Sequence, residues 1–206
     1  LIVGASDELL GRYLPQVASG EAMFSYALSE REAGSDAGAM TCRAVPGDGG
    51  WVLNGQKSWI TNAGISKYYT VMAVTEQGVG PAGISAFVVP AGTPGMIIEP
   101  AYDKLGWHAS DTHGITFVDC RVPADHLLGQ PGEGLRNFLS ILDDGRIAIS
   151  ALALGSARAC LEMALEYAQQ RNAFGGPIGR FQGLAFQLSD LAVQVENAHN
   201  LTYKAA

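Results

Sequence analysis

The sequence predicts an α+β fold in which a β-barrel or β-sandwich is followed by long helices. Between Ala22 and Pro123, eight short runs of β-forming residues alternate with clusters of Gly, Pro, Asn and Asp. From Glu133 onward the apolar residues instead recur every three or four positions, which is the helical period. With 206 residues, 48% of them hydrophobic and 16% charged, the chain has the composition of an ordinary globular protein.

A short helix is expected ahead of the strands. Apolar positions are spaced helically between Leu9 and Val17, and Ser19-Gly20 provides a stop, although Pro15 limits the regularity of this helix. The chain begins without an initiator methionine, and its last residues, LTYKAA, end inside a helical pattern. We therefore expect a piece of a longer protein, in which residues 1–20 end a preceding segment.

The strand region contains two predicted turns. The stretch from Pro46 to Gly50 is rich in residues that tolerate positive φ, so it predicts a hairpin between Val45 and Trp51. Asn54-Gly55 predicts a second turn for the same reason. The expected strands cover residues 24–29, 39–45, 51–55, 57–61, 68–74, 83–89, 95–99 and 114–122.

Two long helices are expected after the strands. The first runs from Glu133 to Gln170 and, if unbroken, is ~55 Å long, although Gly145 and Gly155 weaken its continuity. Gly175-Gly176-Pro177 separates it from a second helix that begins near Phe181 and continues to the end of the chain. Two helices cannot cover all of each other's apolar surface, so we expect a bundle completed by further sequence or by other subunits.

Composition excludes several classes of function. Asp plus Glu outnumber Lys plus Arg by 20 to 13, a net charge of -7, so we expect no nucleic-acid partner. The longest weakly apolar stretch, residues 147–157, is far shorter than the ~20 residues of a membrane span, and none is expected. Cys42, Cys120 and Cys160 lie far apart without a CxxC pair, so neither a disulfide framework nor a metal site is expected.

The usual catalytic constellations are weak in this sequence. Gly34-Ser35-Asp36 is not a nucleophile elbow and has no convincing His partner, which disfavours a Ser-His-Asp hydrolase. The charges of Glu30-Arg31-Glu32 are expected to be solvated. Four histidines are expected to be ordinary surface or loop residues: His108, His113, His126 and His199.

Two neighbouring segments suggest a ligand site. The run from Ala27 to Ala39 leaves a strand into a loop rich in backbone donors and hydroxyls, which can hold an anion or a polar heterocycle, although a plain turn would have a similar composition. One hairpin later, the run from Lys57 to Asn62 places an aromatic ring beside hydroxyl groups at a strand end. Such a pair suits a flat ring that needs a hydrogen bond to one edge, whereas Trp59 alone would more often belong to a core.

These two segments resemble the acyl-CoA dehydrogenase family. The run from Ala27 to Ala39 satisfies every fixed position of that family's signature, and Arg31, where Pro is frequent, occupies a free position. Further matches follow in order along essentially the whole chain. They are LysSerTrpIleThrAsn (57–62), LeuGly with SerAspThr (105–106 and 110–112), ValAspCysArgValPro (118–123), LeuAspAspGlyArg (142–146), ArgAsnAlaPheGly (171–175) and PheGln (181–182).

The resemblance implies a domain organisation and a cofactor. In that family a middle β-domain lies between two helical domains, and FAD lies between the β-domain and the C-terminal helices. Residues 1–20 would then end the N-terminal helical domain, residues 21–130 would form the middle β-domain, and residues 131–206 would begin a truncated C-terminal four-helix bundle. The protein would be a homo-oligomer, a dimer or tetramer.

The resemblance also assigns FAD contacts. Leu28 and Ser29 would meet the pyrimidine edge of the flavin, Thr61 would bond near N5, and Trp59 would pack beside the ring, each with β-domain packing as the alternative. Arg171 and Gln182 would reach the diphosphate and adenosine of a neighbouring subunit's FAD, although Arg171 could instead be a cation at a helix C-terminus. Ala173, in place of a family Thr or Ser, removes one hydroxyl contact. The remaining implied FAD contacts are Tyr26, Ile60 and Phe174.

The substrate contacts implied by the resemblance are Ser35, Asp143 and Arg146. Asp143 and Arg146 lie one helical turn apart, so they could equally form an intrahelical ion pair. The family's catalytic Glu lies in most members in a C-terminal segment absent here, and in a minority on this helix, where Gly145 stands. Asp144 would point ~100° away from that position, so no catalytic base is expected in this span.

The implied reaction is α,β-desaturation of an acyl-CoA thioester in fatty-acid β-oxidation, with electrons passed to an electron-transferring flavoprotein. Two alternatives are a flavin oxidase or monooxygenase of the same superfamily that does not act on CoA esters, and a non-catalytic acyl-CoA-binding paralogue. The resemblance implies that the pocket floor, and with it the acyl chain length, also depends on helices outside this span; Phe138 and Ile141 could shorten the pocket for a short or branched acyl group. The Ala- and Gly-rich composition favours a bacterial cytoplasm, with the mitochondrial matrix as the alternative.

Overall fold

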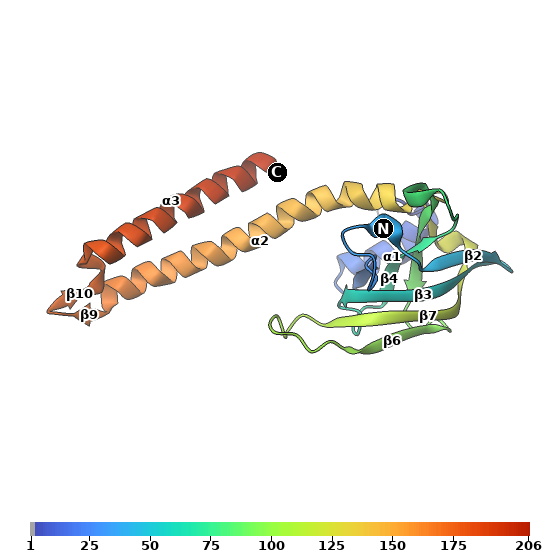
Figure 1. Ribbon diagram of the computed structural model, residues 1–206, viewed down its shortest axis with the longest axis horizontal. Helices are drawn as coiled ribbons and strands as arrows, with labels where there is room; N and C mark the ends of the chain where they lie inside the picture. The colour runs from blue at the N-terminus through green and yellow to red at the C-terminus, as the bar shows by residue number, and fades with distance from the viewer. Residues whose placement is uncertain (1–2) are drawn as a thin grey trace. The chain divides into compact units, whose positions relative to one another are not determined.

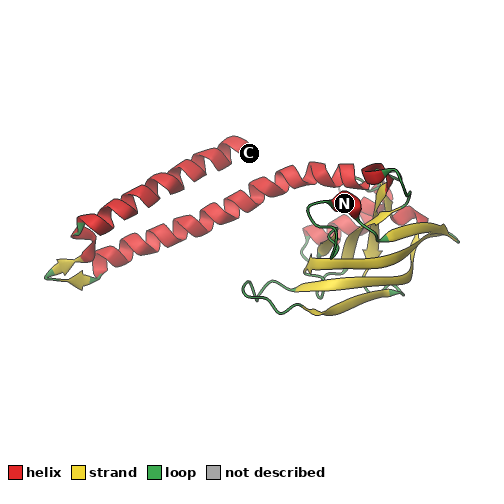
Figure 2. Cartoon of the chain, viewed as in Figure 1, coloured by secondary structure: helices red, strands yellow, loops and turns green. Residues whose placement is uncertain are grey.

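The computed structural model describes residues 3–206 and divides into two compact units. The first unit ends at Leu139 and contains a short helix and a large sheet, and the second runs from Ser140 to Ala206 and is mainly helical (Figures 1 and 2). The predicted α+β class is confirmed by this order of elements.

Helix α1 (Asp7–Ala18) is the short helix expected near the N-terminus. The Ser6 side chain caps it by accepting a hydrogen bond from the Leu9 amide at 3.3 Å, which satisfies one free donor of the first turn. Tyr13 is buried and packs edge-on against the Tyr68 ring at 4.6 Å. An aromatic contact therefore fixes α1 to the sheet.

Strands β1 to β8 form one sheet. Within residues 3–206 its order is β6-β7-β3-β2-β4-β5-β8, with β1 pairing in parallel with β4. Because the end strands β6 and β8 do not pair with each other, the sheet is open, and the barrel alternative of the prediction is wrong. The strand bounds are β1 Phe24–Ala27, β2 Arg43–Gly47, β3 Gly50–Thr61, β4 Tyr68–Val74, β5 Ile84–Pro90, β6 Met96–Ala101, β7 Thr112–Pro123 and β8 Leu127–Leu128.

One of the two predicted turns is present. Strands β2 and β3 form the expected hairpin, in which Gly47 pairs with Gly50. The prediction of a turn at Asn54-Gly55 is wrong, because β3 continues through these residues. The register of β3 against β7 shifts there instead. Gly55 has a φ of 143°, and an added Cβ would lie 2.6 Å from the Cys42 Cα, so this glycine permits a close backbone approach, while the extra residue of the register shift lies in β7.

The second unit is built from two helices joined by a small hairpin. Helix α2 (Gly134–Gln170) begins in the first unit and continues into the second without a break at Gly145 or Gly155. Strands β9 (Asn172–Ala173) and β10 (Gly176–Pro177) and the short helix η4 (Ile178–Arg180) lead into α3 (Gln182–Ala205). Both long helices confirm the periodicity of the sequence to within one or two residues.

Large apolar side chains remain exposed on these helices. By length and composition alone, α2 could cross a membrane, since an 18-residue window reaches a mean hydropathy of 1.4. This finding differs from the expectation of no membrane span, which rested on residues 147–157 alone. The same surface is what an incomplete helical bundle presents. Exposed examples are Ile149, Leu152, Met163, Tyr167, Phe186, Leu201 and Tyr203.

Candidate functional site

The loop that follows β1 is anchored by a buried ion pair. Lys57 Nζ donates to Glu30 Oε1 at 2.8 Å, and the two side chains are only 0% and 6% exposed. The prediction that Glu30 is solvated is therefore wrong. Its carboxylate also accepts hydrogen bonds from the Thr41 amide at 2.6 Å, the Thr41 hydroxyl at 2.9 Å and the Cys42 amide at 3.0 Å.

This environment keeps Glu30 ionised. Burial raises the pKa of the Glu30 carboxyl, but the charge and hydrogen bond of Lys57 and the two backbone amides outweigh burial and leave the pKa below its usual value. A fully paired buried charge is a rigid anchor, since breaking it would leave an uncompensated ion in the core.

The buried Lys57 and its neighbour Ser58 also orient the peptide groups of the Leu28–Ser29 loop. Lys57 Nζ donates to the Leu28 carbonyl at 3.0 Å, and the Ser58 amide donates to the Ser29 carbonyl at 2.8 Å. In a trans peptide the C=O and N–H point in opposite directions. Because the Leu28 carbonyl points at Lys57, the Ser29 N–H points away from it.

Tyr26, on β1, has an orphaned hydroxyl. Its ring stacks on Phe138 in the first turns of α2, with centroids 4.4 Å apart and planes inclined by 13°. Within residues 3–206, the buried hydroxyl has no hydrogen-bond partner, and burial raises its pKa. Since nearly all buried polar groups in proteins are paired, this one fits a group that binds there from outside the chain.

Trp59 stands at a strained bulge near the end of β3. The register of β3 against β7 shifts between Lys57 and Ile60, and Trp59 has a φ of 63°, which is rare for a bulky residue. The bulge places the indole on the surface, where it is 60% exposed and stacks on Tyr102 at 4.3 Å. Strain of this kind persists where the surrounding structure enforces it and is common at ligand sites.

The strand ends bring most of the predicted flavin residues together. The Ser25 hydroxyl donates to the Thr61 carbonyl at 2.7 Å, which joins β1 to the end of β3 beside the Leu28–Ser29 loop. Thr61 is exposed there, whereas the Ile60 side chain is only 2% exposed, so Ile60 can reach a ligand only through its backbone. Ser35 is exposed in the loop that follows the anchor.

Three further predicted residues lie on the connection between α2 and α3. The Arg171 amide bonds to the Tyr167 carbonyl at 2.8 Å and extends the last turn of α2. Phe174 is 92% exposed with a φ of 52°, and its carbonyl accepts from the guanidinium of Arg180. Gln182 is the first residue of α3.

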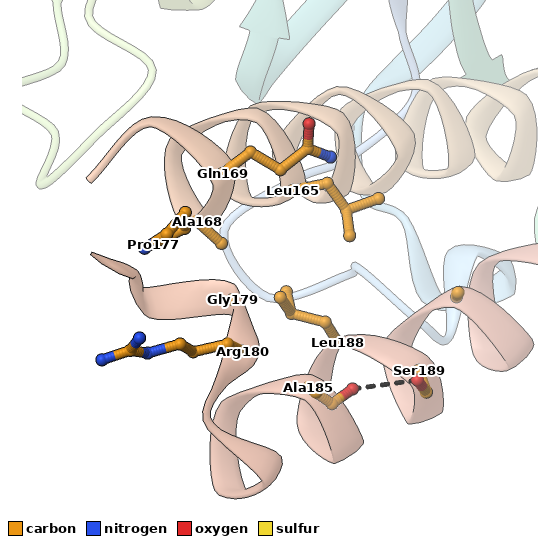
Figure 3. Close-up of a pocket in the computed structure, with 10 residues that line it drawn as sticks. Leu165, Ala168, Gln169, Pro177, Gly179, Arg180, Ala185, Leu188 and Ser189 are labelled. Atoms are coloured by element: carbon orange, nitrogen blue, oxygen red, sulfur yellow. Dashed lines mark hydrogen bonds between the residues drawn. The ribbon is translucent and has the colours of Figure 1, made fainter. Parts of the chain in front are cut away.

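A pocket of about 460 Å³ opens beside this connection (Figure 3). It lies between the end of α2 and the start of α3, with Leu165 and Leu188 on its facing walls and Arg180 at its rim (Figure 3). Its lining is mainly apolar, so it does not resemble a site for a charged group.

Asp143 and Arg146 form the intrahelical ion pair that was the alternative to substrate binding. Arg146 Nη1 donates to Asp143 Oδ1 at 2.6 Å, and the side chains are 73% and 72% exposed. Exposed pairs of this kind contribute little to stability, so neither side chain is held back from another partner.

Two histidines differ from their predicted surface character. His126 is 5% exposed and hydrogen-bonds with the Tyr13 hydroxyl at 3.0 Å, and His113 bonds to Asp111 at 2.7 Å. No group of three potential metal ligands from His, Cys, Asp and Glu occurs within residues 3–206. Sequence reasoning missed the roles of Lys57, Asp111 and His113, because each depends on a partner brought in by the fold.

Two family models match the chain. "Acyl-CoA dehydrogenase, middle domain" matches residues 25–120, and "Acyl-CoA dehydrogenase, C-terminal domain" matches residues 132–206. A "Probable acyl-CoA dehydrogenase" of Mycobacterium leprae is 47% identical over 206 residues, which are 100% of this chain and 53% of that protein. The "Short-chain specific acyl-CoA dehydrogenase, mitochondrial" of Mus musculus is 44% identical over 95% of this chain and 47% of its own.

Solved structures are similar over the same span. Butyryl-CoA dehydrogenase from Megasphaera elsdenii superposes with a TM-score of 0.94 at 40% identity, covering 98% of this chain and 53% of that one. The structure of PigA with FAD and proline gives a TM-score of 0.93 at 33% identity, covering 98% and 52%. The chain therefore spans about half the length of the relatives that it matches.

Proposed function

The chain belongs to the acyl-CoA dehydrogenase family, and from this premise we propose that its protein is an FAD-dependent enzyme that desaturates acyl-CoA thioesters between the α and β carbons. In this proposal residues 1–20 end an N-terminal helical domain, residues 21–130 are the middle β-domain, and residues 131–206 begin a C-terminal helical domain. The observation that carries the proposal is the junction of the Leu28–Ser29 loop with the strained end of β3.

The residues at this junction fit a flavin. The Ser29 N–H, turned outward by Lys57, suits the pyrimidine edge, where negative charge needs a donor. The exposed indole of Trp59 offers an apolar wall for a planar ring, and the Thr61 hydroxyl lies two residues further along the same strand end. The unpartnered hydroxyl of Tyr26 supplies a further donor.

When bound, FAD supplies a hydride acceptor for the β carbon. The residues of this chain bind, orient and shield it. Ser29 would stabilise negative charge on the ring, Thr61 would donate a hydrogen bond to it, and Trp59 would exclude water from it. The base that removes the α proton is expected outside this span, because Gly145 occupies the one position on α2 where some relatives carry it.

The connection between α2 and α3 suits the other end of the cofactor. The guanidinium of Arg171 can donate two hydrogen bonds to a diphosphate, and Gln182 can bond to the adenosine portion. We infer that these residues serve the FAD of a neighbouring subunit, which makes the active protein at least a dimer. The uncovered apolar faces of α2 and α3 support a helical bundle completed by further helices, in preference to a membrane span.

The substrate contacts in this proposal are Ser35 and the pair Asp143 and Arg146. A short or branched acyl group is favoured by Phe138 and Ile141, and the likeness to a short-chain specific enzyme and to butyryl-CoA dehydrogenase supports a short chain. Electrons would pass to an electron-transferring flavoprotein. A bacterial cytoplasm is the proposed location, with the mitochondrial matrix as the alternative that fits the mouse relative's name.

The test is an anaerobic titration of the whole protein, loaded with FAD, with butyryl-CoA. The proposal expects a flavin absorption band near ~450 nm that bleaches as substrate is added. A band that butyryl-CoA and longer or branched acyl-CoAs leave unchanged would favour a flavin enzyme acting on other substrates, the reading that the likeness to PigA with proline supports. A CoA ester that binds without bleaching would identify a non-catalytic paralogue.

A further inference from the structure

A polar clamp holds the three strand ends beside Trp59. Strand β7 lies between β3 and β6 (Figure 1), and His113 pairs with Ile60 on one side and with Ala101 on the other. The Asp111 carboxylate, two residues earlier, accepts hydrogen bonds from the Gly64 amide at 2.7 Å and from His113 Nε2 at 2.7 Å. One short segment therefore ties β3, β6 and the turn after β3 together.

The geometry assigns a positive charge to His113. Its Nε2 faces the Asp111 carboxylate at 2.7 Å, and its Nδ1 faces the Glu99 carbonyl at 2.7 Å. Both partners are acceptors, and a neutral imidazole has only one N–H to donate. Only the doubly protonated ring can donate both hydrogen bonds. The two side chains are also largely shielded from water, with exposed fractions of 13% for His113 and 26% for Asp111.

Other polar and charged groups surround the clamp. Lys104 donates to the Ser110 carbonyl and to the Thr112 hydroxyl, and its charge helps to lower the pKa of Asp111. The Glu99 carboxylate is engaged by the Thr116 hydroxyl at 2.7 Å. Burial and the charge of Asp111 raise the pKa of the Tyr69 hydroxyl, which donates to the Ala63 carbonyl.

The clamp supports the strained residues directly. The Asn62 amide donates to the Asp111 carbonyl at 2.7 Å, and the Tyr102 amide donates to the Thr112 carbonyl at 3.0 Å. Asn62, like Trp59, has positive φ, at 59°. Tyr102 is the residue on which Trp59 stacks, so the backbone of one partner of that stack is bonded to the clamp segment.

Glycine is required where the clamp meets the turn. A Cβ added at Gly64 would lie 2.6 Å from His113 Nε2 and 3.0 Å from the Asp111 carboxylate. The backbone of the turn therefore contacts the ion pair so closely that a residue with a Cβ would clash with it.

We propose that Asp111 and His113 are positioning residues, which hold Trp59 and Thr61 in the geometry that receives the flavin ring and release them when His113 loses its charge. The first part concerns this chain alone, and only the link to the flavin rests on the proposed function. Partial burial lowers the pKa of His113, but the hydrogen bonds to Glu99 and Asp111 outweigh it and raise the pKa above the usual value. The clamp is thus complete at low pH and is lost as pH rises through that raised value.

The test reads the Trp59–Tyr102 stack by near-ultraviolet circular dichroism of the FAD-free protein between pH ~6 and ~9, a range that spans the titration of a histidine. Subtracting the spectrum of the Trp59→Phe variant isolates the stack. The unaltered protein should lose this signal as pH rises. His113→Arg, which keeps a charged donor at every pH, should hold it constant. His113→Gln should show a weak signal that does not titrate, and the exposed His108→Gln should behave as the unaltered protein does.

A stack signal that does not change with pH in the unaltered protein, or one that titrates equally in His113→Gln, overturns the inference. With FAD present, we expect the dissociation constant to rise at least ~tenfold from low to high pH, as losing one charge-assisted hydrogen bond implies, and His113→Arg to abolish that change. If FAD does not bind at any pH, the proposed function fails, and the dichroism still decides the positioning role.

Discussion

Replacing Lys57 by Met tests the buried anchor under the flavin loop. The substitution keeps the length and apolar stem of the side chain but leaves the Glu30 carboxylate 6% exposed without its cation. Three hydrogen bonds from Thr41 and Cys42 remain. Removing one partner of a buried ion pair lowers the free energy of unfolding by about 3 to 5 kcal/mol. Because the three remaining hydrogen bonds still stabilise the carboxylate, we expect a loss of ~3 kcal/mol for Lys57→Met.

Tryptophan fluorescence during urea unfolding measures this cost in the first unit alone, since Trp51, Trp59 and Trp107 all lie there. For a slope of about 2 kcal/mol per M, the midpoint should fall by ~1.5 M. Adding Glu30→Gln to Lys57→Met should recover part of the loss, because no unpaired charge then remains.

The pH dependence supplies a second arm of the same test. In the unaltered protein the pKa of Glu30 is lowered, so its stabilising contribution is present above the unfolded-state pKa and is lost as pH falls through the folded value. In Lys57→Met, burial dominates and the carboxyl can take up a proton. The penalty of that variant should therefore be smaller at pH ~5 than at pH ~7. A midpoint shift below ~0.5 M, or a penalty that does not shrink at acid pH, would refute the role of the ion pair.

Three further changes probe the fold and the site. Gly55→Ala should destabilise the first unit by at least ~2 kcal/mol because its Cβ would strike Cys42 at 2.6 Å, whereas Gly11→Ala, with open space around it, should be neutral or stabilising in the same urea assay. Trp59→Gly should leave stability within about 1 kcal/mol, since relief of strain offsets the lost stack, yet weaken FAD binding measured by fluorescence titration; a large loss of stability would contradict the strain argument. Arg171→Ala should raise the FAD dissociation constant of the oligomer about tenfold, and an unchanged value would remove Arg171 from the cofactor site.

Local signals in the sequence were sufficient for the helices and most strands. The apolar period from Glu133 to Gln170 depends only on neighbours three or four residues apart, and α2 follows it to within one residue. The open sheet could not be predicted in this way, because closure depends on which strands pair across the whole chain. Asn54-Gly55 was misassigned because a glycine with positive φ occurs both in hairpin turns and at close backbone approaches inside a strand.

The residues proposed to line the candidate site follow from the family resemblance, whereas the residues that support them were not predicted from the sequence. Glu30 and Lys57 are 27 residues apart in the sequence, and only the fold brings them together. One signal was present: Leu53, Gly55 and Lys57 follow the inward phase of a period-two strand, which places a lysine where an apolar residue is expected. A charge in that phase predicts a buried partner, and the neighbouring loop offers three acidic candidates, Glu30, Glu32 and Asp36.

The two polar supports explain why strain can be kept at Trp59. The buried pair of Lys57 and Glu30 fixes β3 two residues before the indole, and the pair of Asp111 and His113 fixes the strand end just after it. A positive φ at a bulky residue destabilises the folded state by about 1 to 3 kcal/mol, whereas the exposed stack on Tyr102 stabilises it by only ~0.5 to 1.5 kcal/mol. Stability alone therefore gives no reason for a tryptophan there. A planar ligand that covers the exposed indole gives one, since it adds the burial that the free protein lacks.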